Sequence, residues 1–136
     1  MPSVSVERSI GQTKKAVLGG LIGYNNEKLG KQKYKRLAVS LRERGKIVGG
    51  IVGEVWTNVL FIQLFWIEQK LRGKDYGTKL IGAIEDEARR FGATRSYVDT
   101  MSFQAPGFYR SCGYEEFGSI DGYPRGVTRH WLTKSL

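Results

Sequence analysis

The sequence is poor in the residues that build disulfides and metal sites, because Cys112 and His130 are its only cysteine and histidine among 136 residues. One cysteine cannot form an intrachain disulfide, so we expect a reducing compartment, the cytoplasm. A zinc site would have to draw on carboxylates that show no ligand spacing, and none is expected. No motif orients Cys112 and His130 as a nucleophile and its base.

Long apolar runs are also missing. The longest, residues 59–67, is interrupted by Gln63 and is far shorter than the roughly 20 residues that cross a bilayer, so no membrane partner is expected. The N-terminal stretch MPSVSVERSIG lacks the apolar segment of a secretory signal. With three prolines, no repeat and no Pro- or Ser-rich linker, the chain is predicted to form one domain over residues 1–136.

Acidic residues are outnumbered, since 13 Asp and Glu against 22 Lys and Arg give a net charge of +9. This excess favours polyanionic partners. One basic cluster, in residues 28–46, lacks aromatic interleaving, so a solvated hairpin face is favoured there and a nucleic-acid partner stays an alternative. The other, Lys70, Arg72, Lys74 and Lys79, flanks glycines before a helical pattern, which suits a phosphorylated ligand.

What is present is ordinary globular composition, with 40% hydrophobic and 12% aromatic residues. Apolar periodicity predicts the order β, α, β, β, β, α, β, α, β, β, an α/β or α+β fold around a mixed sheet. The expected strands are 3–10, 37–42, 47–56, 59–67, 95–101, 114–120 and 128–132, and the expected helices are 17–25, 77–91 and 105–112, with a loop at 25–33.

Three local patterns carry structural predictions. Residues 59–67 are apolar on both faces, which predicts a central strand covered on both sides. In helix 77–91, Glu85 with Arg89 and Asp86 with Arg90 are spaced as i, i+4 pairs on the solvent side. Finally, the expected strand at 47–56 contains three glycines, Gly49, Gly50 and Gly53, a pattern typical of a bulge or a close backbone approach.

The most informative unit is the apolar strand followed by LRGKDYGTKL and an amphipathic helix. A strand, a Gly-containing turn and a helix N-terminus place several free backbone N–H groups at one point, where the helix dipole also favours negative charge. This arrangement is typical of a pyrophosphate site, and the alternative from local chemistry alone is an ordinary basic turn at RGKDYG. A second unit, FYRSCGYEEFG, places Tyr109 in a short helix that ends before Gly113 and precedes an aromatic strand.

Together these segments resemble the GNAT superfamily of N-acetyltransferases, whose motif A is a strand, an [RQ]-x-x-G-x-[GA] loop and a helix, and whose motif B is FY-x-x-x-G-[FY]. The resemblance spans most of the chain, from KIVGGIVGEVW to DGYPRGVTRHWLTKSL, and is to a small bacterial-type member. It implies a mostly antiparallel central sheet with helices on both faces and acetyl-CoA as cosubstrate.

The resemblance also implies a set of acetyl-CoA contacts. Strand 59–67 would splay from the next parallel strand and expose main-chain groups of Trp66 and Ile67 to the pantetheine arm, and Lys74 or Lys79 would meet a phosphate. Gln104 is expected either to contact pantetheine or substrate or to hydrogen-bond at the start of its helix. The backbone N–H groups expected around the pyrophosphate are those of Arg72, Gly73, Lys74, Asp75, Tyr76, Gly77 and Thr78.

One residue departs from the family pattern. With Arg72 at the first motif position and Gly77 at the last, Asp75 stands where the first glycine belongs. Asp tolerates a left-handed backbone better than most residues, so the loop shape can survive. Its carboxylate would repel a phosphate about 4 Å away by about 1 kcal/mol in water and about 4 kcal/mol at an effective dielectric constant of 20. Either the side chain turns outward or cofactor binding is weakened.

Acetyl transfer to an amine needs a neutral amine, a polarised carbonyl and a proton for the departing thiolate. The resemblance places Tyr109 beside the sulfur as the proton donor; the alternative is an aromatic side chain packed under the sheet. Glu68, at the end of the apolar strand, is the favoured general base, with Glu54 and Asp99 as other candidates. The alternative for Glu68 is a solvated ion pair with Lys70.

These observations predict an acetyl-CoA-dependent N-acetyltransferase that transfers the acetyl group directly to a primary amine in a ternary complex. Glu54, Glu68 and Asp121 favour a cationic small-molecule acceptor. The alternatives are a protein lysine or N-terminal acetyltransferase, or a module that binds CoA or nucleic acid without catalysis. A homodimer is compatible with the sequence.

Overall fold

The computed structural model describes all residues, 1–136, as two compact units, Met1–Gln32 and Lys33–Leu136. None of its helices has the length and apolar character needed to cross a membrane. The single acetyltransferase-like domain expected over residues 1–136 stays a prediction. The elements are α1 (Gly11–Leu29), β1 (Tyr34–Glu43), β2 (Lys46–Trp56), β3 (Val59–Ile67), α2 (Tyr76–Arg90), β4 (Arg95–Met101), α3 (Pro106–Ser111), β5 (Glu115–Ile120) and β6 (Arg129–Ser135), with short 3-10 turns at Gln69–Leu71 and Pro124–Gly126.

The first unit contains α1 and no strand. The helix expected from the apolar spacing at Val17 is confirmed, but it is longer, and its last turn takes up part of the expected loop at 25–33. The strand predicted for residues 3–10 is wrong. A strand needs a hydrogen-bonding neighbour, and this segment has none: Val4 and Val6 are fully exposed. Two alternating valines were too short a pattern to predict strand pairing.

The second unit is built on a six-stranded sheet in the order β1-β2-β3-β4-β6-β5. All neighbouring strands are antiparallel except β3 and β4, which are parallel. The α+β class, the β1–β2 hairpin and the central position of β3 are therefore confirmed.

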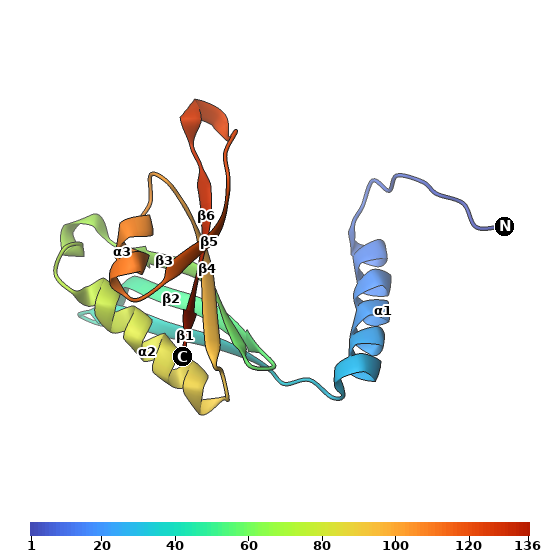
Figure 1. Cartoon of the computed structure of the whole chain (residues 1–136), viewed down its shortest axis with the longest axis horizontal. Helices are drawn as coiled ribbons and strands as arrows, with labels where there is room; N and C mark the ends of the chain where they lie inside the picture. The colour runs from blue at the N-terminus through green and yellow to red at the C-terminus, as the bar shows by residue number, and fades with distance from the viewer. The chain divides into compact units, whose positions relative to one another are not determined.

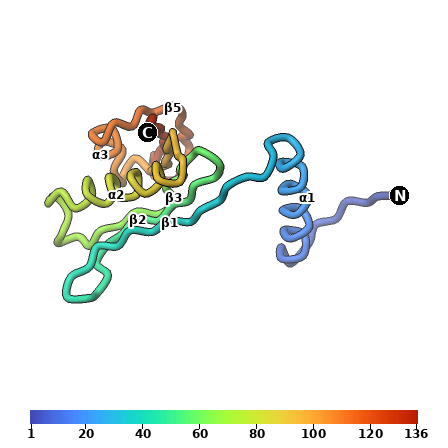
Figure 2. The backbone as a smooth tube through the Cα atoms, turned by 90° about the horizontal axis from the view of Figure 1, so that it is seen from below, coloured from blue at the N-terminus to red at the C-terminus, as the bar shows by residue number.

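Helices α2 and α3 pack on the same face of this sheet, as Figures 1 and 2 show, so the expectation of helices on both faces is wrong for this unit. Alternation along the strands directs one set of apolar side chains to that face. Burying the apolar stripe of α2 against these strands forms the core of the unit. The buried residues at its centre are Ile51, Val55, Leu60, Ile62, Leu80, Ile81, Ile84, Ala88, Val98 and Leu132.

The opposite face is more open than the apolar run of β3 predicted. Leu60 and Ile62 are buried on the helix face, but Leu64 and Trp66 are 67% and 56% exposed. The prediction that this strand is covered on both sides is wrong for its second half. Gln63 is an extra residue at the register shift between β2 and β3, and this β-bulge reverses the alternation. Phe65 and Ile67 therefore pack against the core, whereas Leu64 and Trp66 face away from α2 and α3, the two helices of this unit.

Helix α2 differs from its predicted charge pattern at Glu85. This residue is 4% exposed, and its carboxylate accepts hydrogen bonds from the Tyr114 hydroxyl at 2.8 Å and from Lys134 Nζ at 3.0 Å. The i, i+4 pairs predicted on the solvent side are therefore wrong. The ion pairs that form on α2 are i, i+3 pairs, between Asp86 and Arg89 at 2.8 Å and between Glu87 and Arg90 at 3.2 Å.

The glycines of β2 allow close backbone contact, as predicted. The β2–β3 register shifts between Val52 and Gly53, and a Cβ on Gly53 would lie 2.6 Å from the Phe61 carbonyl oxygen. We expect Gly53→Ala to lower the free energy of unfolding by about 1 to 3 kcal/mol, because the backbone of β3 would have to move. The urea midpoint of unfolding, followed by circular dichroism, measures this loss.

Gly82→Ala in α2 is the matched control. A Cβ there meets no atom within 4 Å, and alanine favours a helix over glycine, so this variant should be neutral or more stable. A Gly53→Ala variant as stable as the wild type would show that the β3 backbone can move at this point without lowering the free energy of unfolding.

Candidate active site

The parallel strands β3 and β4 diverge halfway along their length. Their pairing covers only Val59 with Arg95 through Ile62 with Val98, whereas β3 continues to Ile67 and β4 to Met101. The divergence that the family resemblance implies is therefore present. Main-chain groups in the second half of β3 have no strand partner on the β4 side, so the opening can receive a ligand that hydrogen-bonds to backbone.

The loop that follows β3 leads directly into the N-terminus of α2. Its backbone turns through two left-handed residues, Gly73 at a φ of 74° and Asp75 at 67°. The first turn of α2 contains no acidic residue and no side chain caps it. The N–H groups of Tyr76, Gly77 and Thr78 therefore point out of the helix end without intrahelical partners. With the helix dipole, they form a site suited to an anion.

Asp75 occupies its position as a glycine would. Its left-handed backbone is the conformation that the loop requires, and its carboxylate caps no helix N–H group. The loop shape thus survives the departure from the family pattern. Arg72 connects the loop to the end of β3 by a hydrogen bond, in which its Nε donates to the Ile67 carbonyl oxygen at 2.9 Å.

Gly77, in the first turn of α2, lies next to α3. A Cβ at this position would lie 3.1 Å from the Phe108 ring and 3.6 Å from the Ile67 side chain. The absence of a side chain therefore lets α3 approach the loop and the end of β3. Phe108 in turn lies beside Tyr109, with ring centroids 5.5 Å apart. The segments singled out in the sequence meet at one end of the sheet.

Tyr109 is held by aromatic neighbours at this end. Its side chain is 6% exposed and packs edge-on against Phe65 and Tyr114, with ring centroids 6.2 and 5.9 Å away. Its hydroxyl makes no hydrogen bond within the protein. Burial, followed by the charges of Cys112 and Asp99, raises the pKa of Tyr109 well above the ordinary phenol value. Tyr109 is therefore protonated at neutral pH.

Glu68 and Gln104, two other predicted site residues, both contact neighbouring residues of the protein. The carboxylate of Glu68 is 3.6 Å from Lys70 Nζ, the ion pair weighed as its alternative role. The side-chain oxygen of Gln104 accepts hydrogen bonds from the Met101 N–H at 2.7 Å and the Thr100 hydroxyl at 3.2 Å. Gln104 thus closes the turn after β4, and its NH₂ group makes no hydrogen bond within the protein.

Sequence reasoning missed Arg129, which lies beside the divergence. Its Nη2 donates to Asp99 at 2.6 Å, across the β4–β6 pair. No local spacing could reveal this contact, because the two residues are 30 positions apart and only the strand register brings them together. His130 and Cys112, by contrast, do not meet: the His130 ring contacts Glu116.

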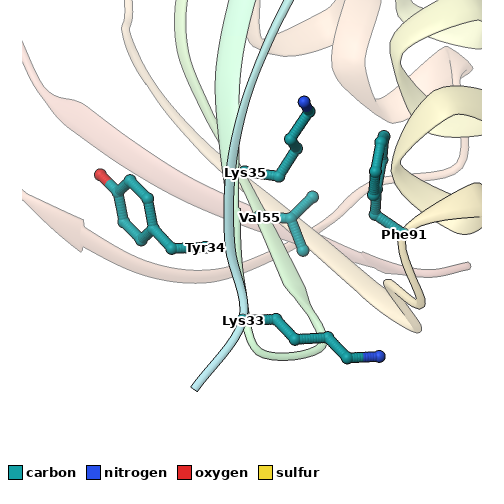
Figure 3. Close-up of a pocket in the computed structure, with 5 residues that line it drawn as sticks. All are labelled: Lys33, Tyr34, Lys35, Val55 and Phe91. Atoms are coloured by element: carbon teal, nitrogen blue, oxygen red, sulfur yellow. The ribbon is translucent and has the colours of Figure 1, made fainter. Parts of the chain in front are cut away.

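A separate hollow of about 280 Å³ lies at the edge strand β1, at the far end of α2 from the loop (Figure 3). Figure 3 shows Lys35 and Phe91 facing each other across it, while Tyr34 points to the other side of the strand. Lys35 Nζ is 5.1 Å from the centre of the Phe91 ring. This hollow belongs to the basic hairpin and contains none of the predicted site residues.

Comparisons with known proteins agree with this geometry. The model of the acetyltransferase (GNAT) family matches residues 18–114. Blasticidin-S acetyltransferase from Streptomyces morookaense is 45% identical over 95 residues, which are 69% of this chain and 70% of that protein.

Solved structures agree as well. An acetyltransferase from Bacillus cereus superposes with a TM-score of 0.89 at 30% identity, over 98% of both chains. A Bacillus anthracis structure described as a streptothricin acetyltransferase in complex with acetyl coenzyme A has a TM-score of 0.66 at 19% identity, over 74% of this chain and 62% of that one. At this lower identity, the second likeness concerns the fold alone.

Proposed function

The chain belongs to the GNAT family of acetyltransferases and is an N-acetyltransferase, and we propose that it transfers the acetyl group of acetyl-CoA to a primary amine of a small cationic molecule. The observation that carries this proposal is the divergence of β3 and β4 beside the N-terminus of α2, with Tyr109 at the same end of the sheet.

The residues at this end fit acetyl-CoA. The end of β3 at Trp66 and Ile67, which has no strand partner on the β4 side, suits the amide-rich pantetheine arm. The backbone N–H groups from Gly73 to Thr78 suit the pyrophosphate, while the N–H of Arg72 donates to the Gln69 carbonyl oxygen at 3.2 Å. Lys74 lies within this turn and Lys79 directly follows it, and both would add positive charge for the phosphates. Gln104 keeps an amide NH₂ group for the cosubstrate or the acceptor.

Two residues of this chain are the proposed proton donor and proton acceptor of the reaction. Tyr109 holds a proton at its hydroxyl and would give it to the departing thiolate of CoA as the bond from carbon to sulfur breaks. Glu68 is the proposed general base for the acceptor amine, directly or through a water. Transfer would be direct, because burial raises the pKa of the Cys112 thiol and a protonated thiol is a poor nucleophile.

The relative's name supports a small-molecule acceptor, since blasticidin-S acetyltransferase is 45% identical to this chain. To test the proposal, the protein is incubated with acetyl-CoA and one acceptor at a time: blasticidin S, spermidine, 2-phenylethylamine or a lysine peptide. Release of CoA thiol and the acceptor's mass are measured. We expect acetylation of a small amine in preference to the peptide. Preference for the peptide would favour a protein acetyltransferase, and acetyl-CoA binding without transfer would favour a non-catalytic module.

Replacing Asp75 tests the phosphate loop. We expect Asp75→Gly to tighten acetyl-CoA binding or leave it unchanged, because glycine adopts the same left-handed backbone and removes a negative charge beside the expected pyrophosphate. Calorimetric titration gives the dissociation constants of both proteins. A clear loss of affinity would mean that the Asp75 carboxylate stabilises the loop.

A further inference from the structure

The side of the divergence that faces away from α2 and α3 carries a carboxylate, Asp99. Val98 is the last residue of β4 to pair with β3, and its side chain is buried on the helix face. Alternation directs the next residue, Asp99, to the opposite face. Asp99 therefore lies at the point where the strands part, on the side from which an acceptor would approach a thioester lodged between them.

Arg129 fixes this carboxylate through one of its two oxygens. Its Nε and Nη2 donate to Asp99 Oδ1 at 3.0 and 2.6 Å. The guanidinium in turn lies 4.9 Å from the ring centre of Trp131, the cross-strand partner of Asp99. The second oxygen, Oδ2, accepts no hydrogen bond within the protein, and the side chain is 22% exposed. An oriented carboxylate with one free oxygen is suited to bind an N–H donor.

The charge of Asp99 also affects Tyr109, the proposed proton donor. Burial, then the charge of Cys112 and then that of Asp99 raise the pKa of Tyr109. Burial, then the charge of Glu54 and then that of Asp99 raise the pKa of Tyr97. Asp99 and the Tyr109 hydroxyl are therefore close enough to interact electrostatically. Tyr109 belongs to the helix side of the sheet and Asp99 to the open side, so the end of the opening lies between them.

We propose that Asp99, oriented by Arg129, binds the ammonium group of the acceptor at the open side of the β3–β4 divergence. The inference rests on the proposed function and adds to it the residue that selects a cationic amine. A carboxylate at this point holds the acceptor nitrogen within reach of the thioester carbon. Trp131 and the stacked pair of Phe61 and Tyr97, with ring centroids 4.7 Å apart, give the surroundings an aromatic surface. Such a surface suits a cation.

Asp99→Asn tests the proposal, because it keeps the shape and removes the charge. A hydrogen bond between charged groups predicts a rise of about 10- to 100-fold in the dissociation constant of the small amine acceptors, measured by calorimetry with CoA present. Binding of acetyl-CoA should change less than about twofold. Asp99→Glu keeps the charge and should restore part of the amine affinity.

Asp86→Asn is the matched control, because Asp86 also pairs with an arginine but lies 78% exposed on the outer side of α2. It should change neither dissociation constant. Unchanged amine binding in Asp99→Asn, or equal losses for amine and acetyl-CoA, would overturn the proposal. If the wild type binds acetyl-CoA but none of the three small amines, the Asp99 inference fails and the cosubstrate site stands. If it binds no acetyl-CoA, the proposed function itself fails.

Discussion

Replacing Tyr109 by phenylalanine should lower kcat for acetyl transfer by about 10²- to 10³-fold, the usual contribution of a positioned general acid. The change removes only the hydroxyl from a side chain that packs against Phe65 and Tyr114. Because that hydroxyl makes no hydrogen bond within the protein, the fold should survive its loss. Steady-state kinetics with the best amine acceptor measure the effect, and acetyl-CoA binding should stay within about threefold.

The pH profile adds a second readout. Burial raises the pKa of Tyr109 above the ordinary phenol value of about 10, so its proton is retained as the pH rises through the neutral range. The wild-type rate should therefore show no loss from this group below about pH 10. Tyr24→Phe, which removes an exposed hydroxyl of α1, is the control and should be as active as the wild type. An equally active Tyr109→Phe would leave packing as the role of this ring.

The second large effect concerns stability. Lys134→Met should lower the free energy of unfolding by about 3 kcal/mol, because it leaves the buried carboxylate of Glu85 without its cation. Glu85 would keep only the hydrogen bond from the Tyr114 hydroxyl, at 2.8 Å. Urea unfolding at pH 7 measures the difference.

A double variant separates the ion pair from the packing. In Glu85→Leu with Lys134→Met, no buried charge remains, and Tyr114 keeps its hydrogen bond with Ser96 at 2.8 Å. Stability should return close to that of the wild type, since well-packed apolar residues replace buried ion pairs at little cost. A double variant no more stable than Lys134→Met would mean that the methylene stem of Lys134, and not its charge, supports this region.

Local patterns predicted much of the second unit. The hairpin, the position of β3, and the elements α2, β4, α3, β5 and β6 follow from the periodicity of neighbouring residues and from turn residues, both of which act over a few positions. The loop from Arg72 to Thr78 was predictable for the same reason. Its N–H groups belong to consecutive residues, so the sequence order is also the spatial order.

What the sequence could not predict depends on contacts between distant segments. The buried carboxylate of Glu85 pairs with Lys134, which is 49 residues away in the sequence. The helical spacing of Glu85 and Arg89 therefore indicated the wrong partner. The contact between Asp99 and Arg129 likewise arises from the β4–β6 register. In the segment 3–10 a local pattern indicated a strand that does not form. Alternating valines do not make a sheet when no neighbouring strand is there to hydrogen-bond with them.

The central claim is that the β3–β4 divergence and the loop before α2 form an acetyl-CoA site. A calorimetric titration of the wild-type protein with acetyl-CoA at fixed salt, with ATP as a polyanion control, tests it most directly. We expect saturable one-to-one binding of acetyl-CoA that ATP does not reproduce. No binding, or equal binding of both ligands, would mean that the excess positive charge attracts phosphates without a specific site, and would contradict the claim.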